Sequence, residues 1–194
     1  MRSLILLFLA LALALGLGGW SAQWALDKTS ELGTEAVGPW LADPQAGSPD
    51  ADPYTRAQLA HLGNLTLGSG EGIVFRAVTD QAGAPLRREC SYAVAGQTPP
   101  ARVWTLAAFT LDGRLIQPGE GRPGWAVSGD LLRHDDNSFN VVTGPLAAAG
   151  NWLATTGSGP FVLALTLYDT PASSSSGVAD LTMPTIVRNG CANG

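Results

Sequence analysis

The sequence has few charged residues and only two histidines and two cysteines. Charged residues make up 14% of its 194 positions, against roughly 25% in an average soluble domain, and the net charge is -5. Proteins that bind nucleic acid normally carry a basic stripe, and this sequence has none, so we expect no nucleic-acid partner. The two cysteines are not spaced as Cys-x-x-Cys, and the two histidines lie far apart. We therefore predict neither a metal site nor a cofactor.

The sequence also lacks the usual patterns of catalytic residues. It contains no Gly-x-Ser-x-Gly elbow. His134 stands beside Asp135 and Asp136, but neighbouring positions on a strand point to opposite faces, and the segment is typical of a hairpin turn. The stretch 119–124 matches Gly-x-Gly-x-x-Gly, although the prolines in and before it indicate a loop rather than the strand and helix of a dinucleotide site.

What the sequence does contain is a long apolar run at its N-terminus. Residues 4–26 are dominated by apolar side chains, and a membrane-spanning helix needs roughly 20 such residues. Arg2 precedes the run and acidic residues follow it. The positive-inside rule then places the N-terminus in the cytoplasm and the rest of the chain outside. We predict that residues 1–26 form a transmembrane anchor in contact with the lipid bilayer of the inner membrane.

A cleaved signal peptide is the alternative interpretation of this run. Signal peptides have an apolar stretch of about 7–15 residues that ends in a small-x-small cleavage site. Cleavage after Gly19 or Ala22 would put Leu17 or Trp20 at the position that requires a small residue. The uncleaved anchor is therefore preferred. Both interpretations export the remainder of the chain to the periplasm or another extracytoplasmic space.

Both cysteines, Cys90 and Cys191, lie in the part of the chain predicted to be exported. An oxidising compartment favours a disulfide when the cysteine count is even. The bond would close a loop of about 100 residues and contribute up to roughly 4–5 kcal/mol in the chain-entropy model. Two buried free thiols are the alternative.

The exported part divides into a linker and a β-rich domain. Residues 27–50, with their Gly-Pro and Asp-Pro steps, are predicted to be a juxtamembrane linker. Residues 51–194 are predicted to form the domain. It would begin with one short helix that Asp52 caps and Pro53 starts. The strands predicted beyond it cover 73–78, 87–95, 102–110, 114–116, 125–128, 139–142, 151–153, 161–168 and 181–187. Many short strands with little helix favour an all-β antiparallel sandwich or jelly roll.

Several short segments follow one another in a specific order between about residue 38 and residue 192. In chain order they are Gly47–Tyr54 with Arg56-Ala57, Leu67–Gly72, Pro99–Leu106, Leu111–Leu115, Gly150–Leu153, Gly159–Leu163, Leu167–Asp169 and Ile186–Ala192. In these segments the chain resembles the bacterial family DUF1214, a domain of unknown function. Each segment is weak alone, and their joint order makes the resemblance specific.

The resemblance implies a jelly-roll-like β-sandwich, often in a short membrane-anchored form and sometimes beside a DUF1254 domain. It implies no established activity. The chain departs from the family pattern at Ala154, where a proline is expected after Asn-Trp-Leu, and at Thr166, where an arginine is expected. A ligand role of that arginine would not extend to this chain.

Aromatic residues supply the candidate ligand site. Trp104, Trp125 and Trp152 lie in or beside predicted strands, and Tyr54 and Arg56 lie in the short helix. Aromatic rings with an arginine can hold a sugar or an apolar ligand, although the tryptophans can equally fill the core.

The sequence supports three hypotheses for function. The preferred one is a non-enzymatic, membrane-anchored module that binds an envelope protein or a small ligand. The second is an envelope hydrolase or lyase acting on saccharide or lipid with carboxylates such as Glu71 or Asp130. The third is a scaffold that docks to a DUF1254-type protein.

Overall fold

A computed structural model describes residues 2–28, 34–62, 66–68, 70–173, 178 and 181–191. Contacts within the chain divide it into two compact units. The helical unit comprises residues 1–33 and 49–66, and the sandwich unit comprises residues 34–48 and 67–194.

The helical unit begins with the apolar helix α1 (Arg2–Lys28). Its segment Arg2–Ala25 has a mean hydropathy of 2.2, and none of its most apolar stretch is buried within the chain. At about 1.5 Å per residue these 24 residues extend for roughly 36 Å, which exceeds the hydrocarbon core of about 30 Å. Among the described residues, α1 alone is long and apolar enough to cross a membrane. The same properties are also found in signal sequences.

The second helix of this unit is α2 (Pro53–Leu62). Asp52 caps it, because its Oδ1 accepts hydrogen bonds from the backbone amides of Tyr54 and Thr55 at 2.8 and 3.1 Å. Pro53 occupies the first helical position, where its missing amide costs nothing. The short helix predicted from this capping pattern is confirmed. Gly63, which follows it, lies outside the described residues.

In its described residues the sandwich unit has ten strands, and the short 3₁₀ helix η1 (Pro171–Ser173) follows the ninth of them. Its strands are β1 (Glu35–Val37), β2 (Trp40–Ala42), β3 (Gly72–Ala77), β4 (Cys90–Gly96), β5 (Val103–Phe109), β6 (Trp125–Val127), β7 (Phe139–Gly144), β8 (Asn151–Ala154), β9 (Val162–Tyr168) and β10 (Thr185–Cys191).

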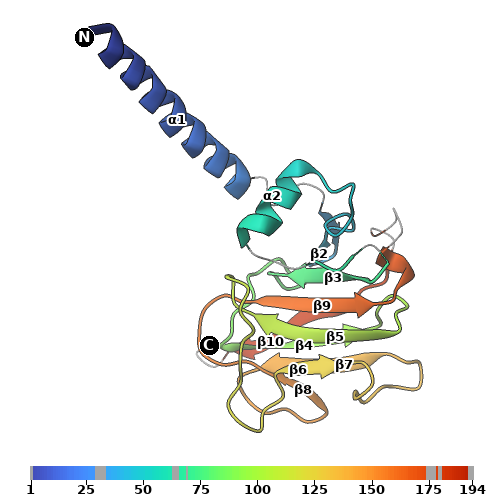
Figure 1. Ribbon diagram of the computed structural model, residues 1–194. Coiled ribbons are helices and arrows are strands. Elements are labelled where there is room, and N and C mark those ends of the chain that lie inside the picture. The colour runs from blue at the N-terminus through green and yellow to red at the C-terminus, as the bar shows by residue number, and fades with distance from the viewer. Residues whose placement is uncertain are drawn as a thin grey trace. The chain divides into compact units, whose positions relative to one another are not determined.

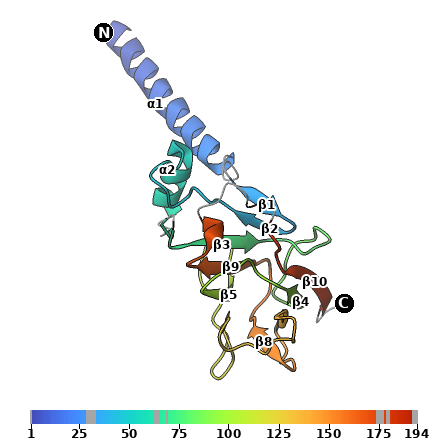
Figure 2. The ribbon, with the colours of Figure 1, turned by 90° about the vertical axis from the view of Figure 1, so that its right-hand side faces the viewer.

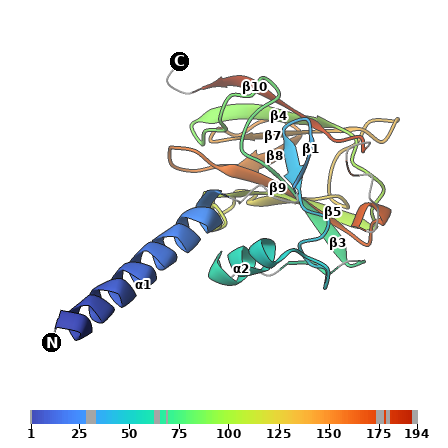
Figure 3. The same ribbon diagram turned by 90° about the horizontal axis from the view of Figure 1, so that it is seen from above.

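The strands form a six-stranded sheet of order β1-β2-β3-β9-β5-β6 and a four-stranded sheet of order β10-β4-β7-β8 (Figure 1). Figure 3 shows β10, β4, β7 and β8 as one layer and β3, β5 and β9 as the other. The predicted all-β sandwich, with one N-terminal apolar helix and one other short helix, is confirmed.

Side chains that alternate along the strands build the core between the layers. In β5, for example, Trp104, Leu106 and Ala108 are buried, while the residues between them are partly exposed. This period of two is the pattern of a strand with one face on a core. The largest fully buried side chains come from both sheets and from the loops between them, and include Trp40, Phe75, Leu86, Tyr92, Phe139, Leu153, Phe161, Leu165 and Ile186.

Part of the predicted linker 27–50 is sheet instead. β1 and β2 form a hairpin that pairs with β3 through Leu41 and Arg76, and Figure 2 shows the hairpin beside β3. Trp40 is completely buried, and its Nε1 donates a hydrogen bond of 2.7 Å to the carbonyl oxygen of Pro184. Residues 34–48 therefore belong to the sandwich unit because a tryptophan in the hairpin fills its core. Residues 29–33 of the range lie outside the described residues.

Two details of strand pairing also differ from the prediction. β7 and β8 pair in parallel, so the four-stranded sheet is mixed rather than antiparallel. The six residues between them, 145–150, carry the chain back along the sheet before β8 begins. The predicted strand at 114–116 is reduced to a single bridge between Phe109 and Leu115, and Gly113 provides the positive φ of 80° that closes the turn.

The disulfide between Cys90 and Cys191 is present. The two residues lie directly opposite each other, at the start of β4 and the end of β10. The bond therefore joins the edge strand of the four-stranded sheet to its neighbour.

Candidate interaction surface

The three tryptophans predicted to bind a ligand do not share one site. Trp104 is buried between the sheets, whereas Trp125 is 61% exposed on the opposite face of the same sheet. Trp152 is partly buried in β8, in the other sheet, and its Nε1 donates to the carbonyl oxygen of Gly144 at 3.1 Å. Tyr54 and Arg56 are exposed on α2, which belongs to the helical unit.

Trp104 forms part of a packed cluster at one end of the core. Its ring centroid lies 4.7 Å from that of Phe139, and the guanidinium carbon of Arg133 lies 5.8 Å from the Trp104 ring. Arg133 also donates to the carbonyl oxygen and Oδ1 of Asn137, at 3.2 and 3.0 Å, and to the carbonyl oxygen of Ser128 at 3.1 Å. These acceptors hold the exposed Arg133 guanidinium over the Trp104 ring.

Beside this cluster is an open hollow of about 210 Å³ with His134 and Asn151 in its wall. The Asn151 side-chain amide donates to the carbonyl oxygens of Leu132 and Asn140, at 2.8 and 3.0 Å, and its Oδ1 accepts from the Leu132 amide at 2.8 Å. Asn151 thus ties β8 to the loop before β7. Because its polar atoms are already paired, it has little capacity left for a ligand.

The acidic residues considered for catalysis lie in turns. His134 and Ser138 are joined through their backbones, and Asp136 accepts from the Ser138 hydroxyl at 2.6 Å, which is the predicted hairpin turn. Hydrogen bonds from Ser138 lower the pKa of the Asp136 carboxyl. Glu71 precedes β3 and Asp130 follows β6, and two strands separate β3 from β6 in the sheet.

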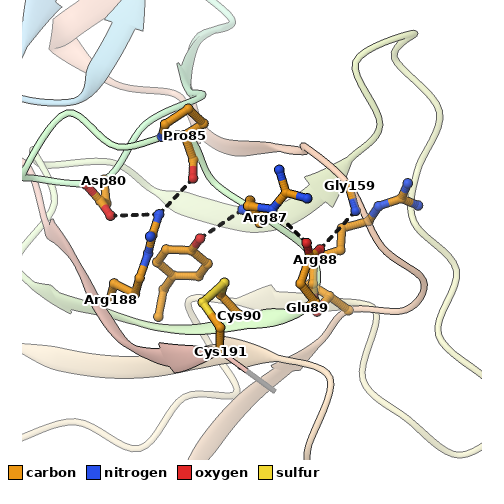
Figure 4. The surroundings of a disulfide bond; sticks show 11 residues. Asp80, Pro85, Arg87, Arg88, Glu89, Cys90, Gly159, Arg188 and Cys191 are labelled. Carbon is orange, nitrogen blue, oxygen red and sulfur yellow. Dashed lines mark hydrogen bonds and ion pairs between the residues drawn. A yellow bond between two sulfur atoms is a disulfide. The ribbon is translucent and has the colours of Figure 1, made fainter. Parts of the chain in front are cut away.

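The loop between β3 and β4 is held against β10 by an ion pair between the buried Asp80 and the partly exposed Arg188 (Figure 4). Asp80 is 4% exposed, and its Oδ2 lies 3.3 Å from Nη2 of Arg188, which also donates to the carbonyl oxygen of Pro85 at 2.8 Å. The Arg188 guanidinium carbon lies 5.5 Å from the Tyr92 ring, near the disulfide. The amide of Gln81 donates to the carbonyl oxygen of Ile186 in β10 at 2.8 Å. This loop therefore covers part of the free edge of β10, which limits strand addition there.

Glu89 connects the segment before β4 to the loop before β9. Its Oε2 accepts from the Gly159 amide at 2.9 Å, and its Oε1 lies 2.6 Å from Nε of Arg87. Hydrogen bonds from the amides of Glu89 itself and Gly159, followed by the Arg87 side chain, lower the pKa of the Glu89 carboxyl to about 2. The carboxylate is thus preferentially stabilised in the folded chain.

This lowered pKa makes stability depend on pH. Because the folded chain holds the Glu89 proton less tightly than the unfolded chain, the stabilisation is fully present above the ordinary pKa of 4.5 and is lost as the pH falls toward 2. The Glu89→Gln variant is expected to have a lower urea midpoint than the wild type at pH 7, with the difference shrinking between pH 4.5 and 2. The exposed Glu120→Gln is the control. A difference independent of pH would contradict the assignment.

The feature that most resembles an interaction surface is the outer sheet face, the side of the six-stranded sheet turned away from the core. Its residues alternate with the buried ones of β2, β3, β9, β5 and β6. They are Leu41, Val74, Arg76, Val103, Thr105, Ala107, Phe109, Trp125, Val127, Val162, Ala164, Thr166 and Tyr168. Most are partly exposed or exposed.

The composition of the outer sheet face is unusual for a surface in contact with water. An antiparallel sheet with one solvated face normally has polar residues on that face. Here Arg76 is the one charged member of the set, and most of the others are apolar. Contiguous apolar surface of this kind commonly marks an interaction site. The sequence alone did not reveal it, because it becomes visible only when the register of four strand pairs is known.

Three comparisons relate the chain to known proteins. A family model described as "Protein of unknown function (DUF1214)" matches residues 71–172, more than half of the chain. The solved structure of the VPA0106 protein from Vibrio parahaemolyticus is similar over 72% of this chain, with 19% identity and a TM-score of 0.58. A putative uncharacterized protein from Burkholderia cenocepacia aligns over 75% with 17% identity and a TM-score of 0.42.

The chain spans 36% and 45% of the lengths of those two structures. The first likeness supports the fold of the sandwich unit. No curated protein matches the sequence.

Proposed function

Because the chain belongs to the DUF1214 family of proteins of unknown function, its role must come from its own structure, and we propose that it is a membrane-anchored, exported β-sandwich that binds a partner through the outer sheet face. The proposal rests on three features that follow one another along the chain. A fully exposed apolar helix precedes a sandwich that is closed by a disulfide and has an apolar outer face.

The anchor is supported by the length and the flanks of α1. Its 24-residue apolar segment is long enough to span the hydrocarbon core, and Arg2 marks the cytoplasmic side under the positive-inside rule. The disulfide supports export independently, because thiols are kept reduced in the cytosol and oxidised outside it. Together they favour one pass through the inner membrane, with the sandwich in the periplasm.

Binding rather than catalysis is supported by the state of the polar groups. Hydrogen bonds lower the pKa of the carboxyl groups of Glu89 and Asp136, which is the opposite of the shift that a general acid needs. Glu71 accepts a hydrogen bond of 2.9 Å from the Gly68 amide within a turn. Glu71 lies next to β3 and Asp130 lies next to β6, and two strands separate β3 from β6 in the sheet. Of the predicted ligand-binding residues, Trp125 keeps its role in this proposal because it lies on the outer sheet face.

The topology can be tested with the full chain carrying a C-terminal epitope tag in a Gram-negative host. The tagged protein is expected in carbonate-washed membranes at its full mass, and protease added to spheroplasts should remove the tag. An otherwise identical chain with Leu9→Arg and Leu13→Arg is the control, because two charges at the centre of α1 oppose insertion. A shortened, carbonate-soluble product would indicate a cleaved signal, and a protected tag would refute export.

A further inference from the structure

We propose that the outer sheet face binds a second copy of this chain, with the two six-stranded sheets packed face to face about a two-fold axis. The axis would run parallel to the strands, between β9 and β5. This inference deepens the proposed function, since it names the partner of the surface assigned there. It follows from how the exposed side chains are arranged across the sheet.

Strand register places these side chains in rows across the sheet. One row runs Arg76, Ala164, Ala107 and Trp125 through β3, β9, β5 and β6. Its two central residues are small and its two outer residues are large. The two long side chains therefore lie at the ends of the row, where they can reach across an interface.

A two-fold rotation about the proposed axis exchanges β3 with β6 and β9 with β5. The Trp125 ring of each copy then faces Arg76 of the other, and Ala107 faces Ala164. An arginine over a tryptophan ring is a favourable cation–π pair, and the symmetry forms it twice. The one charge on the face thus meets the most exposed ring, which is 61% exposed.

The neighbouring row has the same symmetry. It runs Val74, Thr166, Thr105 and Val127 through the same four strands. The rotation places valine opposite valine and threonine opposite threonine. A surface that pairs each residue type with a compatible one under a single rotation is self-complementary, which is the requirement of an isologous dimer.

The size of the face favours a weak dimer. The rotation superposes four strands, β3, β9, β5 and β6, which have 6, 7, 7 and 3 residues. At about 3.3 Å per residue and about 4.8 Å between strands they cover on the order of 360 Å². Two such faces bury about 700 Å², which is less than a stable dimer of soluble chains needs. Anchoring both copies in one bilayer through α1 would raise their effective concentration and compensate for the modest area.

The test is photo-crosslinking of the full chain in its membranes. p-Benzoylphenylalanine replaces Ala107, and a second copy of the chain carries a different epitope tag. Irradiation is expected to give a product of twice the monomer mass that contains both tags. Val142 in β7, partly exposed on the outer side of the four-stranded sheet, is the matched control position and should give little of this product.

Variants of Arg76 and Trp125 test whether the crosslink depends on the proposed cation–π pair. Arg76→Glu is expected to reduce the crosslinked product roughly tenfold, because the cation–π pair is lost at both ends, while Arg76→Lys should retain most of it. The double variant Arg76→Glu/Trp125→Arg puts opposite charges across each end and should restore the product. A folding defect would give no such rescue.

The inference is overturned if the product contains one tag only, if position 142 crosslinks as well as position 107, or if a protein of another mass is captured at position 107. The same membranes report on the proposed function separately. Monomers in carbonate-washed, protease-accessible form would refute the dimer and leave the anchor intact. Mixed-tag dimers in a carbonate-soluble fraction would refute the anchor and support the dimer.

Discussion

Removing the disulfide is expected to lower the free energy of unfolding by about 4–5 kcal/mol, which is comparable to the entire stability of many small domains. Cys90 and Cys191 are 101 residues apart, and the loop that they close includes β4 to β10. Without the bond, the unfolded chain gains the conformational freedom of that loop. The folded chain also loses the covalent tie between the edge strand β10 and its neighbour.

Urea titration of the detergent-solubilised full chain measures this effect. Cys90→Ala/Cys191→Ala is compared with the oxidised wild type and with wild type that has been reduced and alkylated. Both the variant and the reduced, alkylated chain should unfold at much lower urea, since both lack the crosslink. The variant truncates the buried Cys90 side chain and alkylation enlarges it, so a loss common to both reports on the crosslink. A loss below about 1 kcal/mol would show that the loop entropy does not govern stability here.

Trp40→Ala is expected to cost about 3–5 kcal/mol, the usual effect of removing a large aromatic side chain from a core. Trp40 is completely buried, and its Nε1 satisfies the carbonyl oxygen of Pro184, 144 residues away. The substitution opens a cavity and leaves that oxygen unpaired. A residue in a solvated linker would show almost no effect.

Trp40→Phe and Leu146→Ala complete this experiment. Phenylalanine keeps most of the ring volume and loses the hydrogen bond, so an intermediate loss is expected. Leu146 is 75% exposed and its truncation should change the free energy of unfolding by less than about 0.5 kcal/mol. Equal effects of Trp40→Ala and Leu146→Ala would refute the placement of β1 and β2 within the sandwich.

The sequence predicted the parts of the fold that local patterns encode. β3, β4, β5 and β9 carry six or seven residues with clear alternation or continuous apolar character, and all were predicted within a few positions. The cap at Asp52 and the pairing of the only two cysteines followed from equally local rules. Each of these features depends on residues near one another in the chain or on a simple count.

The features that the sequence did not predict depend on distant contacts. β1 and β2 have three residues each and flank Gly38-Pro39, so the local sequence predicts only a turn there. The contact that places them in the sandwich is the hydrogen bond between Trp40 and Pro184, which are far apart in the chain. The parallel pairing of β7 and β8 was not expected across six residues, because parallel strands usually need a longer crossover.

The candidate surface was missed for a related reason. Trp104 and Trp125 look alike in sequence, and one is buried while the other is exposed. Which side of the sheet each tryptophan occupies depends on strand register. The apolar outer sheet face can be recognised only when the register places Ala107 beside Ala164, because an alanine in the sequence does not indicate which face of a sheet it occupies.

The position of the two cysteines also sets an order of events during biosynthesis. A ribosome adds roughly 5–20 residues per second, so Cys90 emerges about 5–20 s before Cys191. During that time its thiol has no partner in the chain. In the exported chain proposed above, an oxidising catalyst can hold this thiol as a mixed disulfide. With only two cysteines in the sequence, no wrong intramolecular bond competes. β4 is then free to pair with β7 first. β10 is the last strand in the chain, and its pairing with β4 places Cys191 opposite Cys90 so that the disulfide can form.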